Sequence, residues 1–327
     1  MKAVVREVYG SADVLEFVDV DRPVAGEGQV LVRVRAAGVD PGVWHLMTGL
    51  PYPVRLVSGL RVPKDRRLGT DVAGEVAAVG RGVTRFAVGD AVFGTCGGAF
   101  AEYAVGAEDG FVAKPANLTF EQAAAVPVSA CTALRGLRDT GRVRAGQDVL
   151  VIGAGGGVGA YAVQLAKVFG ARVTGVCGPA KADLVRSLGA DAVIDYTRAD
   201  FADGTRYDLV LDTAGNRTLA HLRRALTPKG TLVIVGGEAE GKLLRGIDRQ
   251  LRGFALSLFV GQRIRTFVAS QPRADLELLR EHIEAGALRP VVDRTYPLSA
   301  TADAVRYLAR GHPTGKVVIT VQPGRER

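Results

Sequence analysis

The sequence predicts an α/β protein of two domains, one rich in β-strands and one built on a doubly wound parallel sheet. The chain has 327 residues, which is enough for two domains with full-sized cores. Short β-prone runs separated by Gly, Pro and Asp extend from Met1 to about Phe120. From Val149 onward strands alternate with helices, an order typical of a parallel sheet.

The N-terminal part is expected to form an irregular antiparallel barrel. A long polar excursion, from Pro51 to Leu68, is expected to leave it. Thr119 is a candidate N-cap for a helix through Ala123–Ala125, which Pro127 would end or kink, and a second helix is expected around Ser129–Arg138. The β-prone runs are Lys2–Val8, Val30–Arg35, Asp71–Val79, Asp90–Phe93 and Phe100–Val105.

The middle of the chain shows the β/α alternation. Strands that alternate with helices argue for a parallel, doubly wound sheet. The expected strands are Val149–Ile152, Arg172–Val176, Ala192–Ile194, Leu209–Asp212 and Leu232–Val235. The expected helices are Gly157–Phe169, Lys181–Leu188 and Leu219–Leu226.

The tail returns to mixed structure, so we expect it to pack back on the first domain. The domains are then residues 1–122 with 266–327, and residues 123–265. The expected elements of the tail are a helix at Arg273–Ala285, a strand at Val291–Tyr296, a helix at Ala300–Ala309 and a strand at Lys316–Val321.

A glycine run, Gly153–Gly159, lies between the strand Val149–Ile152 and a helix that starts near Val158. Glycines leave bare backbone for a pyrophosphate, and the N–H groups and dipole of a helix N-terminus favour its charge. The alternative is that the helix needs glycine only for close packing. Because a second strand follows at Arg172–Cys177, the frame predicts a dinucleotide site. Its contacts are expected from Gly153, Gly156, Gly157, Val158 and Gly159.

The charge pattern after the second strand predicts which dinucleotide binds. An NAD site has an acid about 20 residues after the glycines, but the next acid after Asp148 is Asp183. The strand is followed instead by the small residue Gly178 and by Lys181, and this pair would accept a 2′-phosphate. Arg198 could add positive charge. The alternative for Lys181 is an ordinary solvated lysine, but the missing acid favours NADPH over NADH.

Charge and hydropathy exclude other classes of protein. The net charge of +8 is dispersed, without the basic stripe interleaved with aromatics that nucleic-acid binding needs. The uncharged run Val149–Ala166 is long enough for a membrane span, but its glycines, Gln164 and its strand-like start argue against one. The N-terminus lacks the apolar core of a signal peptide. We therefore expect a cytoplasmic protein with a small-molecule substrate and no nucleic-acid or membrane partner.

Motifs along the whole chain resemble one enzyme family. They are Leu68–Gly94 (LGTDVAGEVAAVGRGVTRFAVGDAVFG), Ala99–Val105 (AFAEYAV), Lys114–Leu134 (KPANLTFEQAAAVPVSACTAL), the glycine run, Ser187–Tyr196 (SLGADAVIDY), Leu226–Gly237 (LTPKGTLVIVGG) and Gly315–Val321 (GKVVITV). In this order and spacing they resemble the medium-chain dehydrogenase/reductase superfamily, in its zinc-free quinone oxidoreductase branch. The resemblance implies a GroES-like irregular β-barrel domain and a Rossmann domain.

The resemblance also implies residues for the cofactor. The run Gly153–Gly159 fits the seven-residue pattern Gly-x-x-Gly-x-x-Gly of quinone reductases, and Tyr196 is placed beside Lys181 at the 2′-phosphate. An ordinary core aromatic is the alternative for Tyr196. Near the nicotinamide, the resemblance places Thr132 at the ribose and Gly236 and Gly237 on the other side.

The catalytic candidates by resemblance are Asp40, His45 and Tyr52, in a cleft between the barrel and the dinucleotide domain. Asp40 stands where quinone reductases often carry an asparagine; it can accept a bond from a ribose hydroxyl but would repel a developing enolate. His45 and Tyr52 are titratable groups on the wall facing the nicotinamide, and either can donate a proton. Alternatively, these residues shape an aromatic pocket with Trp44 and Tyr103, and water supplies the proton.

Zinc divides this superfamily, and here the ligand residues are missing. The positions of the family's cysteine and histidine ligands look like Asp40 and Thr70. A hydroxyl is a poor zinc ligand, and a catalytic zinc site needs three protein ligands. The cysteines, Cys96, Cys131 and Cys177, are too far apart in sequence for a zinc cluster or a disulfide framework. We expect no metal.

The first hypothesis is an NADPH-dependent, zinc-free oxidoreductase that transfers a hydride to a quinone or an activated alkene (an enone). The second is a zinc-independent alcohol or carbonyl dehydrogenase, which is chemically harder because zinc normally polarises the oxygen. The third is an NADPH-binding protein with a structural or sensing role. The resemblance further implies a homodimer that pairs edge strands near Leu232–Val235.

Overall fold

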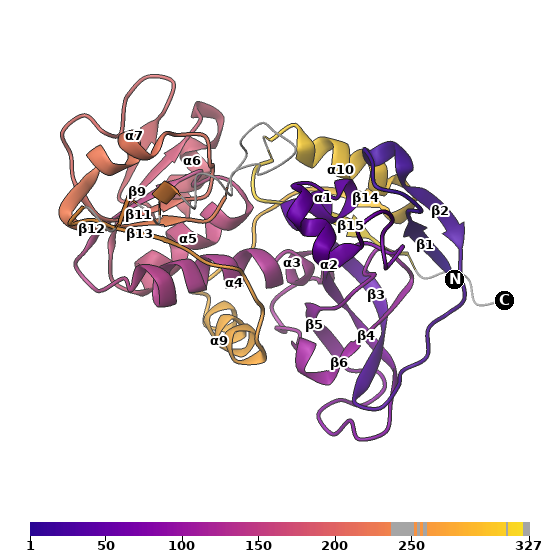
Figure 1. Ribbon diagram of the computed structural model, residues 1–327. Coiled ribbons are helices and arrows are strands. Elements are labelled where there is room, and N and C mark those ends of the chain that lie inside the picture. The colour runs from indigo at the N-terminus through magenta and orange to yellow at the C-terminus, as the bar shows by residue number, and fades with distance from the viewer. Residues whose placement is uncertain (237–251, 254–255, 258–259, 312, 323–327) are drawn as a thin grey trace. The chain divides into compact units, whose positions relative to one another are not determined.

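The computed structural model describes the chain apart from residues 237–251, 254–255, 258–259, 312 and 323–327 (Figure 1). It divides into two compact units, which we call unit 1 (Met1–Cys131 with Ser270–Arg327) and unit 2 (Thr132–Ala269). The domain limits expected from the sequence, 1–122 with 266–327 and 123–265, stay a prediction.

Unit 1 is rich in strands, most of them antiparallel. Its strands are β1 (Lys2–Val5), β2 (Glu16–Asp19), β3 (Gln29–Val39), β4 (Asp71–Val79), β5 (Ala91–Thr95), β6 (Tyr103–Ala107), β7 (Phe111–Ala113), β14 (Val292–Pro297) and β15 (Lys316–Thr320). The main sheet runs β14, β15, β3, β4, β5, β7, and β6 also pairs with β3. Strands β1 and β2 form a separate antiparallel pair.

Strand β3 organises this sheet. It extends past the expected Val30–Arg35 because the apolar run Ala36–Val39 continues it, and most of its side chains are buried. Strand β15 pairs antiparallel with β3, with Val317 opposite Val39, so the tail joins the barrel as the sequence predicts (Figure 1). Strand β6 begins at Tyr103, later than the expected Phe100, whose N–H bonds to the Leu68 carbonyl instead.

The helices of this part of the chain are α1 (Pro41–Thr48), α2 (Arg55–Ser58), α3 (Phe120–Ala124), α4 (Pro127–Arg135), α9 (Arg273–Glu284) and α10 (Thr301–Ala309). Thr119 caps α3 as predicted, in a reciprocal pair of bonds with Gln122. Pro127 begins α4, which runs across the limit between the units. Helix α1 was not expected, because the Asp-Pro-Gly sequence at its start is typical of a turn.

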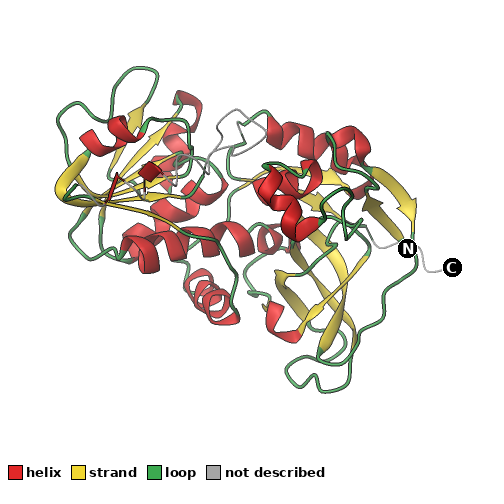
Figure 2. Ribbon diagram, in the orientation of Figure 1, coloured by secondary structure: helices red, strands yellow, loops and turns green. Residues whose placement is uncertain are grey.

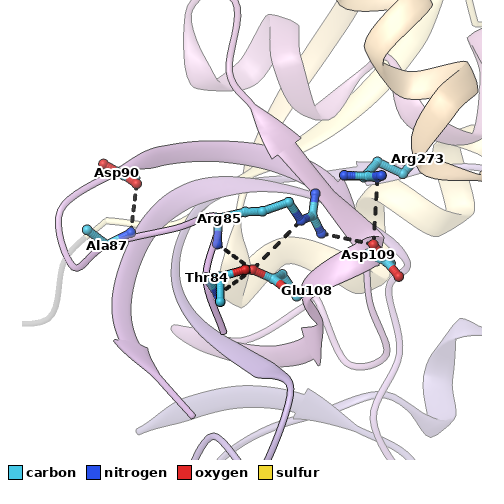
Figure 3. Close-up of polar contacts among 7 residues, drawn as sticks. All are labelled: Thr84, Arg85, Ala87, Asp90, Glu108, Asp109 and Arg273. Atoms are coloured by element: carbon cyan, nitrogen blue, oxygen red, sulfur yellow. Dashed lines mark hydrogen bonds and ion pairs between the residues drawn. The ribbon is translucent and has the colours of Figure 1, made fainter. Parts of the chain in front are cut away.

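A group of polar contacts within unit 1 reaches the start of the tail helix α9 (Figure 3). The Glu108 carboxylate accepts the N–H groups of Arg85 (2.6 Å) and Thr84 (2.9 Å). The Arg85 guanidinium binds Asp109 at 3.0 Å, and Asp109 also faces Arg273 Nε, at the start of α9, at 3.6 Å. Since exposed ion pairs contribute little free energy, burial of the apolar face of α9 dominates its docking; that face is Leu276, Leu279 and Ile283.

Unit 2 is a parallel sheet flanked by helices (Figure 2). Its strands are β8 (Asp148–Ile152), β9 (Arg172–Cys177), β10 (Ala192–Asp195), β11 (Tyr207–Asp212), β12 (Leu226–Ile234) and β13 (Arg263–Thr266), and its helices include α5 (Gly157–Val168), α6 (Ala182–Ser187) and α7 (Leu219–Arg224). The spatial order is β10, β9, β8, β11, β12, β13, and every pair is parallel. The order reverses between β8 and β11, where such sheets bind ligands.

The edge of the unit 2 sheet differs from the expectation. Strand β12 covers the expected Leu232–Val235 up to Ile234, but it is paired on both sides, by β11 and β13. Among the described residues the edge on that side is β13, and since β12 is paired on both sides, the expectation that Leu232–Val235 lies at an edge is wrong. Strand β13 is short, and its alternation of arginines with Ile264 gave no clear strand signal. The expected helix to Leu226 ends at Arg224, because Leu226 already begins β12.

The expected polar excursion, Pro51 to Leu68, exposes apolar as well as charged side chains. The stretch between β3 and β4 contains α1, α2 and a turn before α2, and several large apolar side chains on it are exposed: Tyr52, Leu56, Val57, Leu60 and Val62. The charged residues Arg55 and Arg61 between them, and the charged run 64–67 that follows, hid this in the sequence. Among the described residues, no helix has both the length and the apolar character needed to cross a membrane.

Candidate functional site

The glycine turn follows β8 and leads into α5, as the sequence predicts. Gly153 has a φ of 83°, Gly156 is the N-cap of α5, and Gly157 and Val158 begin the helix. A Cβ at Gly159 would lie only 2.1 Å from the Gly153 carbonyl oxygen, so α5 can pack on the turn only with glycine there. No side chain caps the N-terminus of α5, so the N–H groups of its first turn are available to an anion.

Thr213, which sequence reasoning missed, lies between two predicted glycines. Its hydroxyl donates to the Ile152 carbonyl at 2.7 Å. A Cβ at Gly153 would come within 2.6 Å of the Thr213 hydroxyl, and one at Gly236 within 2.7 Å of the Thr213 carbonyl oxygen. These residues follow β8, β11 and β12, so they meet where the strand order reverses. The sequence Asp-Thr-Ala-Gly, which begins at the last residue of β11, is the available signal.

Four residues gather at the carboxyl ends of β8, β9 and β10. A Cβ at Gly155 would lie 2.7 Å from Lys181 Cδ, so the Lys181 side chain lies over the glycine turn. Gly178 starts the short turn to Lys181, whose N–H donates to the Gly178 carbonyl at 3.0 Å. A Cβ at Gly178 would lie 3.4 Å from the Tyr196 hydroxyl. The structure therefore brings Lys181, Tyr196 and the glycines together.

Asp195, an acid on the strand next to β9, is not part of the charge pattern from which NADPH is predicted. Asp195 ends β10 opposite Cys177 of β9. Its carboxylate accepts the N–H (2.9 Å) and the hydroxyl (2.7 Å) of Thr197, and these two bonds, the backbone one first, lower the pKa of Asp195. Arg198 Nε lies 3.7 Å from the same carboxylate. The charge of Asp195 is thus partly balanced by its own turn, and Arg198 is engaged there.

Two further cofactor candidates, Thr132 and Gly237, are not tested by these contacts. Thr132 is buried in α4, at the first position of unit 2. Gly237 lies outside the described residues. The roles expected for both stay predictions.

The catalytic candidates of unit 1 lie on and beside α1. Asp40 is the N-cap of α1: its Oδ1 accepts the Gly42 N–H at 2.7 Å, while its Oδ2 is buried without a partner among the described residues. His45 lies one turn further along, with its Nδ1 2.7 Å from the Leu50 carbonyl. A carbonyl only accepts, so Nδ1 carries the proton and Nε2 of the neutral ring is an acceptor.

Tyr52 follows α1, in the turn before α2. The Arg55 guanidinium lies over its ring, with 5.0 Å between Cζ and the ring centroid. Trp44 packs edge-on against His45, with ring centroids 5.4 Å apart. Tyr103 instead carries the Arg22 guanidinium over its ring at 3.9 Å. Of the expected aromatic pocket, the structure therefore joins Trp44 with His45.

A buried ion pair, which sequence reasoning also missed, lies next to Asp40. Asp71 Oδ2 accepts from Lys316 Nζ at 3.1 Å and Asp71 Oδ1 from the Val128 N–H at 2.9 Å, and both charged side chains are almost fully buried. Burial, more than the like charge of Asp40, raises the pKa of Asp71 to about 6 against the opposing effect of Lys316. Gly38 faces this pair, since a Cβ there would lie 2.8 Å from Asp71 Oδ2.

The two positions that correspond to the family's zinc ligands, Asp40 and Thr70, lie where β3 ends and β4 begins. Gly38 of β3 pairs with Asp71 of β4; Asp40 comes two residues after Gly38, and Thr70 directly precedes Asp71. Both carboxylate oxygens of Asp71 are already hydrogen-bonded, one to Lys316 and the other to Val128. Within the described part of the chain, no three His, Cys, Asp or Glu side chains are arranged to hold a metal ion.

Comparison with known proteins identifies the family to which this architecture belongs. The model of the alcohol dehydrogenase GroES-like domain matches residues 26–116, and the model of a family described as zinc-binding dehydrogenase matches residues 188–319. The chain is 32% identical over 332 residues to a chloroplastic quinone-oxidoreductase homologue of Spinacia oleracea, covering 95% of each chain. It is 36% identical to the chloroplastic NADPH-dependent alkenal/one oxidoreductase of Arabidopsis thaliana, covering 98% of this chain and 79% of that one.

A solved structure agrees with the family models and with the two relatives. The quinone oxidoreductase from Coxiella burnetii superposes with a TM-score of 0.86 at 29% identity, covering 98% of this chain and 99% of that one. The strand-rich unit 1 and the parallel sheet of unit 2 are thus a GroES-like domain and a Rossmann domain. The chain belongs to the medium-chain dehydrogenase/reductase superfamily, in its quinone oxidoreductase branch, and is an oxidoreductase.

Proposed function

We propose that the protein is an NADPH-dependent reductase that transfers a hydride to a quinone or an enone without a metal. The observation that carries the proposal is the glycine turn with Lys181 and Tyr196 beside it and no acid at the end of β9. The names of its relatives support the substrate class, since one is a quinone-oxidoreductase homologue and another an NADPH-dependent alkenal/one oxidoreductase. Thr70 and Asp40 at the zinc-ligand positions support the absence of zinc.

The residues of unit 2 fit a dinucleotide. A side chain at Gly153, Gly155 or Gly159 would collide with neighbouring atoms. The N–H groups of the first turn of α5, which begins at Gly157, are those that would bind a pyrophosphate. The Lys181 ammonium and the Tyr196 hydroxyl would bind the 2′-phosphate. When bound, the nicotinamide supplies the hydride, and the protein must orient the acceptor and provide a proton.

Two side chains of unit 1 differ in their fitness as proton donors. Neutral His45 has its proton on Nδ1, which is bound to the Leu50 carbonyl, so Nε2 can give a proton only from the charged imidazolium. The Tyr52 hydroxyl is a donor in its neutral form. We therefore favour Tyr52 as the side-chain donor, with water as the alternative source. Asp40, with a buried Oδ2, would act as an acceptor.

Consumption of NADPH with three acceptors tests the function. With purified protein we expect turnover of 1,4-benzoquinone or an aliphatic enone, at a rate that a chelator leaves unchanged. Loss of activity with the chelator would contradict the metal-free proposal. Turnover of an aldehyde alone would favour a carbonyl reductase, and no turnover with any acceptor would favour a protein that only binds NADPH.

Replacing Lys181 by alanine tests the cofactor choice. Removing a charged partner of a phosphate costs about 1.5–3 kcal/mol, so we expect KM for NADPH to rise about 10–100-fold. KM for NADH should stay unchanged, because NADH has no 2′-phosphate. Lys229→Ala, at an exposed lysine of β12, is the control and should change neither value. An equal rise in KM for both cofactors would show that Lys181 does not bind the 2′-phosphate.

We also propose domain limits at 1–122 with 266–327 and 123–265, a homodimer and a cytoplasmic location. Strand β13, the last strand of the unit 2 sheet in the described part of the chain, supports a dimer that extends this sheet, because an edge strand can pair with another copy. The names of relatives include chloroplastic proteins, so fractionation of the native cells is the test of location.

A further inference from the structure

The stretch between α1 and β4 exposes large apolar side chains that an ordered segment normally buries. We call residues 55–67 the surface segment. Leu56 is 70% exposed, Val57 75%, Leu60 68% and Val62 58%. Single exposed apolar residues need no explanation, but a group of four within seven positions marks a binding surface.

Polar contacts hold the surface segment from its inner side. The Tyr9 hydroxyl bonds to Ser58 Oγ at 2.8 Å and donates to the Gly59 carbonyl at 2.7 Å. Arg55 Nε donates to the Gly49 carbonyl at 3.1 Å, and its guanidinium lies over the Tyr9 ring at 4.6 Å. The segment is thus fixed through its polar groups and turns its apolar ones to the outside, the reverse of an ordinary surface helix.

The segment is also strongly basic. It holds Arg55, Arg61, Lys64, Arg66 and Arg67 against the single acid Asp65. Arg66 pairs with Glu7 and Arg67 with Asp65. Arg61 and Lys64 are exposed, with no ion-pair partner among the described residues, and they alternate with the exposed Leu60 and Val62. Uncompensated positive charge therefore lies directly beside the apolar side chains.

We propose that the surface segment docks on an anionic lipid surface, with its apolar side chains in the interface and Arg61 and Lys64 on lipid phosphates. A second copy of the chain fits poorly, because a two-fold contact places a patch against itself and would bring the same positive charges together. Nucleic acid would satisfy the charges but leave Leu56, Val57, Leu60 and Val62 uncovered. The segment lies on the surface rather than across the bilayer, and the proposal revises the expectation of no membrane partner.

Sedimentation with vesicles tests the proposal without any turnover, so its outcome is separate from that of the proposed function. We expect the protein to sediment with vesicles of phosphatidylcholine and phosphatidylglycerol, to do so several-fold less at high salt, and to bind pure phosphatidylcholine weakly. Arg61→Glu with Lys64→Glu, and separately Leu56→Ser with Val57→Ser, should each lower the partition coefficient at least about tenfold.

Matched controls carry the same changes outside the surface segment. Lys229→Glu with Arg206→Glu changes the net charge equally, and Val24→Ser with Val88→Ser removes two exposed valines; both should bind like the unaltered protein. Equal binding by all variants, or no binding to anionic vesicles, would overturn the proposal. So would a dimer that Leu56→Ser with Val57→Ser dissociates, since the segment would then bind a second copy.

Discussion

Replacing Lys316 by methionine is expected to lower the free energy of unfolding by about 3–5 kcal/mol, because it leaves the buried carboxylate of Asp71 without its counter-charge. Asp71 is fully buried and Lys316 nearly so, and their ion pair at 3.1 Å joins β4 to β15. Methionine keeps the length and apolar character of the lysine chain, so the loss reports on charge rather than on packing. Equilibrium unfolding in urea measures it.

A second variant separates the charge from other effects. With Asp71→Asn added to Lys316→Met, the buried charge is gone and an amide oxygen can still accept the Val128 N–H. Replacing a buried pair by neutral groups is often close to neutral, so most of the lost free energy should return, to within about 1.5 kcal/mol of the unaltered protein. If Lys316→Met alone changed stability by less than about 1 kcal/mol, the pair would not hold the barrel.

Replacing Gly159 by alanine is expected to weaken NADPH binding at least about 100-fold, because α5 must shift to make room for the new Cβ. The methyl would lie 2.1 Å from the Gly153 carbonyl oxygen and 2.8 Å from Ala154 Cα, and both are backbone atoms that cannot rotate away. The shift would move the helix N-terminus from the position that presents its N–H groups to the pyrophosphate. Titration by NADPH fluorescence measures the affinity, and circular dichroism checks the fold.

Gly97→Ala is the matched control for this change. A Cβ at Gly97 meets only Asp65 Oδ2, at 3.8 Å, and the residue has no positive φ, so the same substitution fits there without strain. It should bind NADPH like the unaltered protein. An affinity of the folded Gly159→Ala protein within threefold of normal would place the cofactor away from the glycine turn.

What the sequence could predict was local in the chain. The strand, turn and helix around Gly153–Gly159 form a continuous run, and the alternation of strands with helices gave the parallel sheet of unit 2. Lys181 and Tyr196 were placed together only through the family resemblance, and the structure brings them to Gly178. The capping residue Thr119 followed from a pattern of four residues.

What the sequence could not predict depends on residues distant in the chain or on which side of a segment faces out. Lys316 and Asp71 are separated by 245 positions, so no pattern links them before β15 pairs with β3. Thr213 matters because β11 lies beside β8, a neighbourhood set by the strand order. The charges of the surface segment predict a polar stretch, whereas its orientation follows from the Tyr9 and Arg55 contacts beneath it.

The pairing of β15 with β3 has a consequence for synthesis on the ribosome. Every strand of unit 2 has been translated by Thr266, so its sheet can form while the rest of the chain is still being made. The main sheet of unit 1 begins with Gln29 but must wait for the strand that ends at Thr320. Until then β3 has an open side and Asp71 lacks its cation. The unit that is translated second is therefore the one that can fold first.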